Sequence, residues 1–118
     1  GAGTRVELRC PDPAANPYLV LAVCLEAGLD GIRNQITPPD AVTENVFEMQ
    51  LQQRAKLGIE SLPGDLEQAV EELEKDDYIK NVLGGHITEK YLEAKKAEWA
   101  DYRAQVTEWE IEKYLYKI

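Results

Sequence analysis

Residues 18–29 form a nearly unbroken apolar run, broken only by one glutamate and one glycine, and this run restricts the possible folds most strongly. Asn16 and Pro17 stand directly before it, and they are typical N-cap and first-turn residues of a helix. A helix that is apolar on nearly every side needs cover on nearly every side. The sequence therefore predicts a buried helix over residues 16–33. A chain of 118 residues has little with which to cover it.

Residues 4–10 alternate charged and apolar side chains with a period of two, which predicts a short strand. Two prolines in the sequence Pro-Asp-Pro end it, so residues 1–13 are expected to be a strand and a proline turn. A strand needs a neighbour to satisfy its backbone groups. Since no later segment has a strand pattern, we expect the partners of this strand to be missing from the chain.

The remainder is predicted to be mainly helical, with a helical end over residues 65–118. Asp65 and Gln68 have the spacing of a capping box at the start of an amphipathic helix. A short helix is expected to follow from Asp76 to a pair of glycines, and a longer one from about residue 87 to 104. The longer helix is expected to carry an apolar stripe that continues into the turn after it, formed by Leu92, Trp99, Tyr102 and Val106. The fold class is therefore mainly α with one short N-terminal strand.

The last predicted helix, from Glu108 to about Lys117, begins with a capping box of Thr107 and Glu110. It ends the chain with large apolar side chains, and a helix of this kind usually docks on its own domain or on a partner. The residues expected to make this contact are Trp109, Tyr114, Leu115 and Ile118.

The charge balance excludes some classes of partner. The chain has 13 Lys and Arg against 22 Asp and Glu, a formal net charge of −9, whereas a nucleic-acid binder needs a basic face. Its apolar runs are shorter than the roughly 18 residues of a membrane span, and no segment has the pattern of a signal peptide. We therefore expect a cytoplasmic protein that binds neither nucleic acid nor membrane.

The cysteines and the histidine offer little chemistry. Cys10 and Cys24 do not form a CxxC pair, and such residues are more often small buried hydrophobes than a disulfide or metal ligands. His86 follows two glycines and is interpreted as a helix-start residue, because a general base needs an orienting partner that the sequence does not indicate.

One cluster of charged residues has a composition that could support catalysis or binding. It is the charged face of the predicted strand, formed by Arg5, Glu7 and Arg9. From the pattern alone, two interpretations remain open. The three side chains could form a salt-linked face in solvent. Alternatively, they could form the floor of a site, with the carboxylate binding a hard cation and the guanidinium groups holding a carboxylate or phosphate.

The same segment resembles a known family. Residues 4–19 are similar to the last active-site strand and the following helix of type I (bacterial) glutamine synthetases, and later blocks match in the family's order. The matching blocks are Thr4-Arg5-Val6-Glu7-Leu8-Arg9, Pro11 to Leu19, Ala27-Gly28-Leu29-Asp30-Gly31-Ile32 before Pro38-Pro39, Leu57-Gly58-Ile59, Leu62-Pro63-Gly64, and near the C-terminal end Trp99, Tyr102-Arg103, Val106-Thr107 and Trp109-Glu110.

This resemblance implies a C-terminal fragment of an α+β catalytic domain. The family joins ammonia to L-glutamate with ATP, through a γ-glutamyl phosphate, and uses two Mg²⁺ or Mn²⁺ ions. By position, Glu7 matches a metal-ligand glutamate, and Arg9 an arginine that contacts the glutamate substrate or the transferring phosphoryl group. Arg5 would have a supporting catalytic charge role. Because the family's other metal ligands and ATP-binding residues lie upstream, the fragment alone is expected to be inactive and to bind neither ATP nor metal tightly.

The resemblance also implies an assembly. Subunits of the family form two stacked rings, the C-terminal helix reaches into the opposite ring, and in some relatives it contacts regulatory proteins. Some members are switched off by adenylylation of a loop tyrosine, and Phe47 occupies that position here, so no modification is expected there. The alternative hypothesis is a free-standing acidic helical protein-interaction module, which composition alone would favour.

Overall fold

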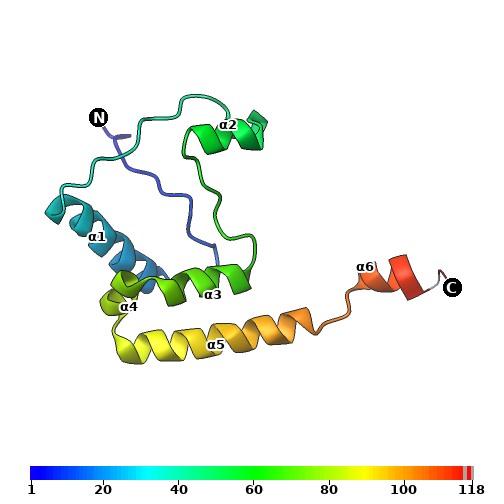
Figure 1. The fold of residues 1–118 in the computed structure, drawn as a ribbon. Coiled ribbons are helices and arrows are strands. Elements are labelled where there is room, and N and C mark those ends of the chain that lie inside the picture. The colour runs from blue at the N-terminus through cyan, green and yellow to red at the C-terminus, as the bar shows by residue number, and fades with distance from the viewer. Residues whose placement is uncertain (116, 118) are drawn as a thin grey trace. The chain divides into compact units, whose positions relative to one another are not determined.

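Figure 1 shows the computed structural model, which describes residues 1–115 and 117. Helices and turns are found in this part of the chain, and no strand is. The chain divides into two compact units, Gly1–Gly64 and Asp65–Ile118. None of the helices in the described part is both long enough and apolar enough to cross a membrane.

The first unit contains the apolar helix α1, Pro17–Arg33, and its predicted position is confirmed. The side-chain oxygen of Asn16 accepts hydrogen bonds from the backbone N–H groups of Tyr18 (3.0 Å) and Leu19 (3.3 Å), as an N-cap does. At the other end, Gln35 has a φ of 52°. The Ile36 N–H then reaches the carbonyl of Gly31 at 2.9 Å, which closes the helix in a Schellman motif.

The burial predicted for α1 is not found within this chain. None of its residues is buried, and Leu21 and Leu25 expose 68% and 64% of their surface. The rest of the unit consists of short helices and irregular segments, and these are too few to cover a helix that is apolar all round.

The remainder of this unit holds a 3₁₀ turn, η1 (Val46–Glu48), and a short helix, α2 (Leu51–Lys56). The Asn45 side chain caps η1 by accepting from the Phe47 N–H at 3.2 Å. Met49, which follows the turn, is buried, whereas the Phe47 side chain is fully exposed. The turn therefore presents an aromatic ring to solvent.

The second unit is built on three helices: α3 (Leu66–Lys75), α4 (Asp77–Leu83) and α5 (Gly85–Arg103). The predicted starts of α3 and α4 are confirmed, because the Asp65 and Asp76 carboxylates accept from backbone N–H groups three residues later, at 2.8 and 3.0 Å. Helix α5 begins at Gly85, two residues before its predicted start. Gly84, between α4 and α5, has a φ of 79°, a left-handed conformation that favours glycine.

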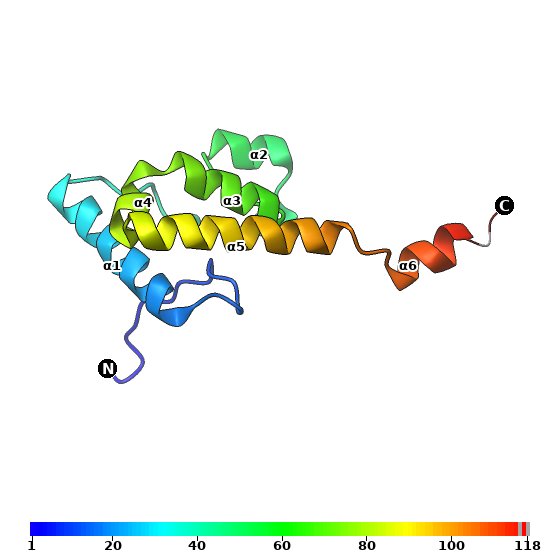
Figure 2. The same ribbon diagram turned by 90° about the horizontal axis from the view of Figure 1, so that it is seen from below.

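Helix α5 packs against both α3 and α4, as Figure 2 shows. Val70 of α3 and Thr88 of α5 are buried, and the Thr88 hydroxyl donates to the Lys80 carbonyl at 3.1 Å. The apolar stripe predicted on α5 is only partly buried: Trp99 is half-buried, but Tyr102 and Val106 are exposed.

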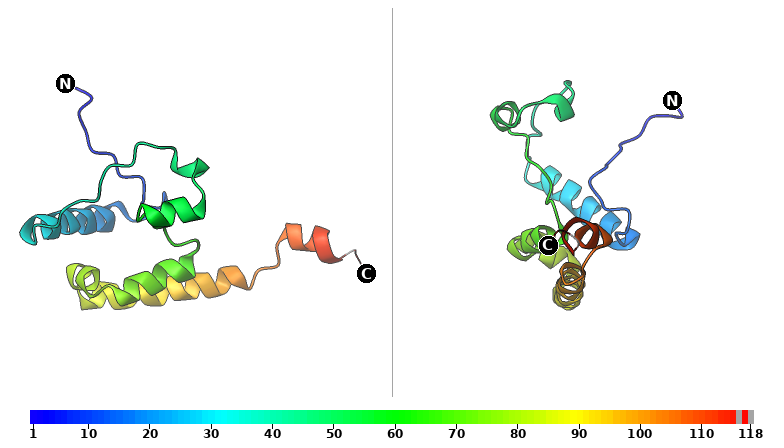
Figure 3. Two further views of the ribbon diagram at one scale, coloured as in Figure 1. Left: turned by 45° about the horizontal axis from the view of Figure 1, so that its top comes forward. Right: turned by 90° about the vertical axis from the view of Figure 1, so that its right-hand side faces the viewer.

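The chain continues after α5 into α6 (Glu108–Glu110) and a π-helical turn, η2 (Ile111–Leu115), visible in Figure 3. The predicted capping box is confirmed. The Thr107 hydroxyl accepts from the Glu110 N–H at 3.2 Å, and the Glu110 carboxylate accepts from the Thr107 N–H at 2.8 Å. The two hydrogen bonds that Thr107 donates to the Glu110 carboxylate, first from its backbone N–H and then from its hydroxyl, lower the pKa of the Glu110 carboxyl below its ordinary value of 4.5.

The N-terminal strand predicted over residues 4–10 is wrong for this chain. The segment has no regular structure, and the Val6 side chain is 97% exposed. The reason is physical. A strand is defined by its ladder of hydrogen bonds, and no other segment among the described residues is extended beside it to form one.

Candidate functional site

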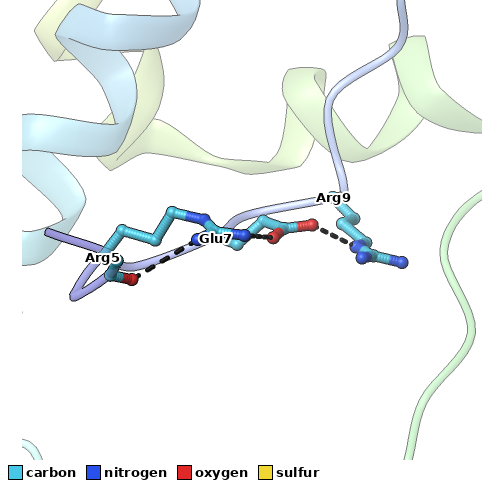
Figure 4. Close-up of polar contacts among 4 residues, drawn as sticks. Arg5, Glu7 and Arg9 are labelled. Atoms are coloured by element: carbon cyan, nitrogen blue, oxygen red, sulfur yellow. Dashed lines mark hydrogen bonds and ion pairs between the residues drawn. The ribbon is translucent and has the colours of Figure 1, made fainter.

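The candidate site is the charged face of residues 4–10, shown in Figure 4. Arg5, Glu7 and Arg9 lie two residues apart along the chain, and the structure brings all three charged groups together. Arg9 Nε donates to Glu7 Oε1 at 2.6 Å, and Arg5 Nη2 lies 3.5 Å from Glu7 Oε2. Each oxygen of the carboxylate therefore faces one guanidinium group.

The two arginines meet the carboxylate in different ways. Arg5 uses its terminal nitrogens, since Nη2 faces Glu7 and Nη1 donates to the Gly3 carbonyl at 3.4 Å. Arg9 uses Nε, and among the described residues no hydrogen bond engages its Nη1 or Nη2. Figure 4 shows the contact between Arg9 and Glu7.

The face is solvent-exposed and carries a local charge of +1 within an acidic chain. The side chains of Arg5, Glu7 and Arg9 are 70%, 47% and 85% exposed. Exposed ion pairs contribute about 0–1 kcal/mol each to stability. The two ion pairs of this cluster therefore add little to the stability of the fold.

Glu7 fits a metal site only as one ligand of several. A hard divalent cation takes about six oxygen ligands, and one carboxylate supplies one or two of them. The described residues contain no group of three or more His, Cys, Asp or Glu side chains that could hold a metal ion. Cys10 and Cys24 are free thiols, but the burial expected of them is wrong, since Cys10 is exposed and Cys24 is only half-buried. His86 lies in the first turn of α5, as predicted.

One feature that the sequence did not indicate is a hollow of about 300 Å³ between α3 and α5. Two ion pairs cross it, Lys96 with Glu74 and Arg103 with Glu67. Trp99 also lines it, and its indole N–H is buried with no hydrogen-bond partner in the described structure. The charges here pair with each other, so the hollow is a packing feature of the helices.

The predicted docking residues at the C-terminal end are exposed. Trp109, Tyr114 and Leu115 expose about 60% of their surface, at 59%, 61% and 59%, and Ile118 lies outside the described residues. The Trp109 and Tyr114 rings meet edge to face with centroids 5.8 Å apart, and Lys113 Nζ lies 5.9 Å from the Trp109 centroid. These residues therefore form an apolar surface with an ordered aromatic pair.

Comparison with known proteins adds the following. The family described as "Glutamine synthetase, catalytic domain" matches residues 1–114. The glutamine synthetase of Clostridium saccharobutylicum is 53% identical over 117 residues, which are 99% of this chain and 26% of that protein. The glutamine synthetase of Thermotoga maritima is 53% identical over 116 residues, 98% of this chain and 26% of that protein.

A solved structure described as "Apo GmaS without ligand" has the same fold over most of the chain. It superimposes with a TM-score of 0.76 at 41% sequence identity, and the match covers 92% of this chain and 24% of that one. The chain thus spans about a quarter of the length of the relatives that it matches.

Proposed function

Because this chain belongs to the glutamine synthetase catalytic-domain family, we propose that it is the C-terminal portion of an ATP-dependent glutamate–ammonia ligase. The parent enzyme would join ammonia to L-glutamate through a γ-glutamyl phosphate, in glutamine biosynthesis and nitrogen assimilation in the cytoplasm. The observation that carries the proposal is identity of about one half to glutamine synthetases over nearly the whole chain. The chain alone would be inactive, since it spans only about a quarter of such an enzyme.

The residues that we assign to the reaction are those of the charged face. Glu7 would be one ligand of a divalent metal, Mg²⁺ or Mn²⁺, with the other ligands supplied by the remainder of the parent enzyme. Arg9 would bind the glutamate substrate or the transferring phosphoryl group, since a guanidinium group matches the oxygens of either. Arg5 would support the charge of the site through its contacts with Glu7 and Gly3.

These assignments rest on the resemblance of the segment to the family, and the charge changes of phosphoryl transfer support them. Bound metal ions neutralise negative charge on ATP phosphates as the phosphoryl group moves. Arg9 would hold an anionic oxygen in place and balance the charge that develops on it. Its short contact with Glu7 would limit the rotation of its side chain before substrate arrives.

The C-terminal surface would serve assembly. A homo-oligomer of two stacked rings needs contacts between rings, and the exposed Trp109, Tyr114 and Leu115 offer an apolar surface for one. Ile118 belongs to the same proposal by sequence. The same end could bind a regulatory protein.

The alternative, a free-standing acidic helical interaction module, is not supported by the relatives found, which are glutamine synthetases. The acidic composition of the chain was the reason to consider this alternative. Acidic side chains on the helix surfaces pair with lysines, as Glu72, Glu93 and Glu98 do. Such exposed pairs are ordinary features of solvated helices.

The test is an ATP- and metal-dependent biosynthetic assay of the full-length parent, with Glu7→Ala beside wild type. Loss of an outer-shell partner of a metal ligand costs roughly 10- to 100-fold in activity, so loss of a ligand should cost at least as much. Glu89→Ala, an exposed glutamate on α5, is the matched control and should keep activity. An active parent with an unaffected Glu7→Ala variant would reduce Glu7 to a structural charge, and an inactive wild type would refute the ligase proposal.

A further inference from the structure

One arginine of the chain differs from the others in having no acidic partner. Arg54, in the last turn of α2, forms no ion pair and no side-chain hydrogen bond among the described residues. The chain has 22 Asp and Glu against 13 Lys and Arg, so a lone arginine is unexpected in it. Every other arginine does pair with a carboxylate: Arg5 and Arg9 with Glu7, Arg33 with Glu26, and Arg103 with Glu67.

The Arg54 side chain is also partly buried. Its Nε–H group is buried and has no hydrogen-bond partner in the described structure, while the residue as a whole is half-buried. Nearly all buried polar groups in proteins have a partner, because an unpaired one loses its hydration without compensation. A cation in the last turn of a helix is favoured by the helix dipole, but the dipole supplies no acceptor for Nε. The buried N–H group therefore indicates an acceptor from elsewhere.

The backbone of Arg54 is fixed at both of its polar groups. Its N–H donates to the Gln50 carbonyl at 3.1 Å, and its carbonyl accepts from the Leu57 and Ile59 N–H groups at 3.1 and 2.9 Å. The bond from Ile59 closes a turn around Gly58, whose φ of 67° lies in the left-handed region. The side chain therefore starts from a fixed backbone position, which lowers the entropic cost of forming a contact.

The surroundings of Arg54 favour a polypeptide partner over a free ion. The Glu44 carboxylate, nearby in sequence, accepts instead from Gln53 Nε2 at 3.3 Å. Leu51 lies three residues before Arg54, so the two side chains are neighbours on one face of α2, and Leu51 is 74% exposed. A free anion would satisfy the guanidinium group but leave Leu51 in water. A segment with an acidic and an apolar side chain would satisfy both.

We propose that Arg54 and Leu51 form a docking site for a segment of the parent polypeptide outside residues 1–118, and that a carboxylate of this segment pairs with the Arg54 guanidinium group. The inference rests on the proposed function, because that proposal makes the chain about a quarter of a longer enzyme. Helix α1 belongs to the same unit and likewise lacks cover within the chain, so this unit requires the remainder of the parent at more than one place.

The energetic test uses the full-length parent. Arg54→Met keeps a long side chain but leaves a covered carboxylate without its partner, so the thermal unfolding midpoint should fall by roughly 3–10 °C. Lys56→Met is the matched control, since Lys56 is an exposed cation in the same turn of α2, and its midpoint should change by about 1 °C or less. Arg54→Lys keeps the charge and should lie between Arg54→Met and wild type. Sedimentation verifies that each variant assembles.

The Arg54→Lys variant also identifies the partner. A carbodiimide joins the introduced amine to a carboxylate that contacts it, forming an amide bond, and mass spectrometry then locates the carboxylate. We expect a cross-link from position 54 to an Asp or Glu outside residues 1–118. Wild type, which has no amine at this position, should not form it.

Inorganic phosphate tests the other kind of occupant, a free anion. If phosphate bound at Arg54, it would raise the midpoint of wild type more than that of Arg54→Met. We expect equal shifts in the two proteins, since any phosphate bound elsewhere in the parent affects both alike.

Three results would each overturn the inference. They are an Arg54→Met midpoint equal to that of Lys56→Met, the absence of a cross-link from position 54 to a residue outside residues 1–118, and a phosphate shift that depends on Arg54. None of these measurements needs turnover. An active parent with any of these results would therefore refute only the docking site, whereas an inactive parent with the expected midpoints and cross-link would refute only the proposed function.

Discussion

The packing of α5 against α3 can be tested by removing two methyl groups from its centre. Val70 on α3 is 6% exposed, so Val70→Ala deletes atoms that are almost wholly buried. Each buried methyl or methylene group is worth about 0.8 kcal/mol, which gives about 1.6 kcal/mol for the two. A residual cavity would raise this cost, whereas the better helix propensity of alanine would lower it by about 0.5 kcal/mol. The expected loss in free energy of unfolding is therefore about 1–2 kcal/mol.

The assay is urea unfolding of this chain, followed by the fluorescence of Trp99, which lines the hollow between the same two helices. A Trp109→Phe background removes the other tryptophan, which is 59% exposed at the C-terminal end. Stability changes are compared at unchanged m value, so that a shift of the midpoint reports the free energy of unfolding alone.

The matched control is Val106→Ala, the same chemical change at a valine that is 72% exposed. Exposed substitutions away from special features usually change stability by less than about 0.5 kcal/mol. If the two valine variants were destabilised equally, or if Val70→Ala had no effect, α3 and α5 would not pack as described, and the reasoning from burial to stability would fail for this unit.

Two further predictions concern the capping box and the exposed loop. The pKa of Glu110 is lowered by hydrogen bonds from Thr107, so its contribution to α6 is present above the ordinary value of 4.5 and is lost as pH falls through the lower folded value. NMR shifts of residues 108–111 should lose helical character in that acid range in wild type but not in Glu110→Gln, whose neutral amide oxygen still accepts; an identical acid transition in both would contradict this. Phe47, which is fully exposed in η1, has no hydroxyl group, so mass spectrometry of the parent should find no AMP adduct on residues 45–49, and an adduct there would refute the expectation.

The features that the sequence predicted correctly are those that depend on neighbouring residues. The helix caps Asn16, Asp65, Asp76 and Thr107 are as expected, because in an N-cap a side-chain oxygen accepts a hydrogen bond from a backbone N–H only two or three residues later. The shared face of the charged cluster was predictable for the same reason. In an extended backbone, residues two apart project to the same side whether or not a sheet is present.

The wrong or incomplete predictions all concern contacts between segments distant in sequence. The period-two pattern of residues 4–10 indicates a strand, but a strand exists only with a partner, and the described chain has none. The apolar composition of α1 indicates a need for cover, and cover depends on atoms that this chain does not supply. Pattern alone therefore shows what a segment requires and cannot show whether the requirement is met.

The apolar stripe predicted on α5 combines a feature that local sequence determines with one that only the tertiary structure decides. Its spacing identified a helix with an apolar side, which is a property of local sequence. How far along the helix that side is buried depends on α3. Glu67, near the start of α3, pairs with Arg103 at the end of α5, whereas Val106 lies after α5 and is exposed. The orientation of Arg9 is similar in kind. The sequence places a guanidinium group beside a carboxylate, but only the three-dimensional arrangement decides which of its nitrogens that carboxylate engages and which edge remains open.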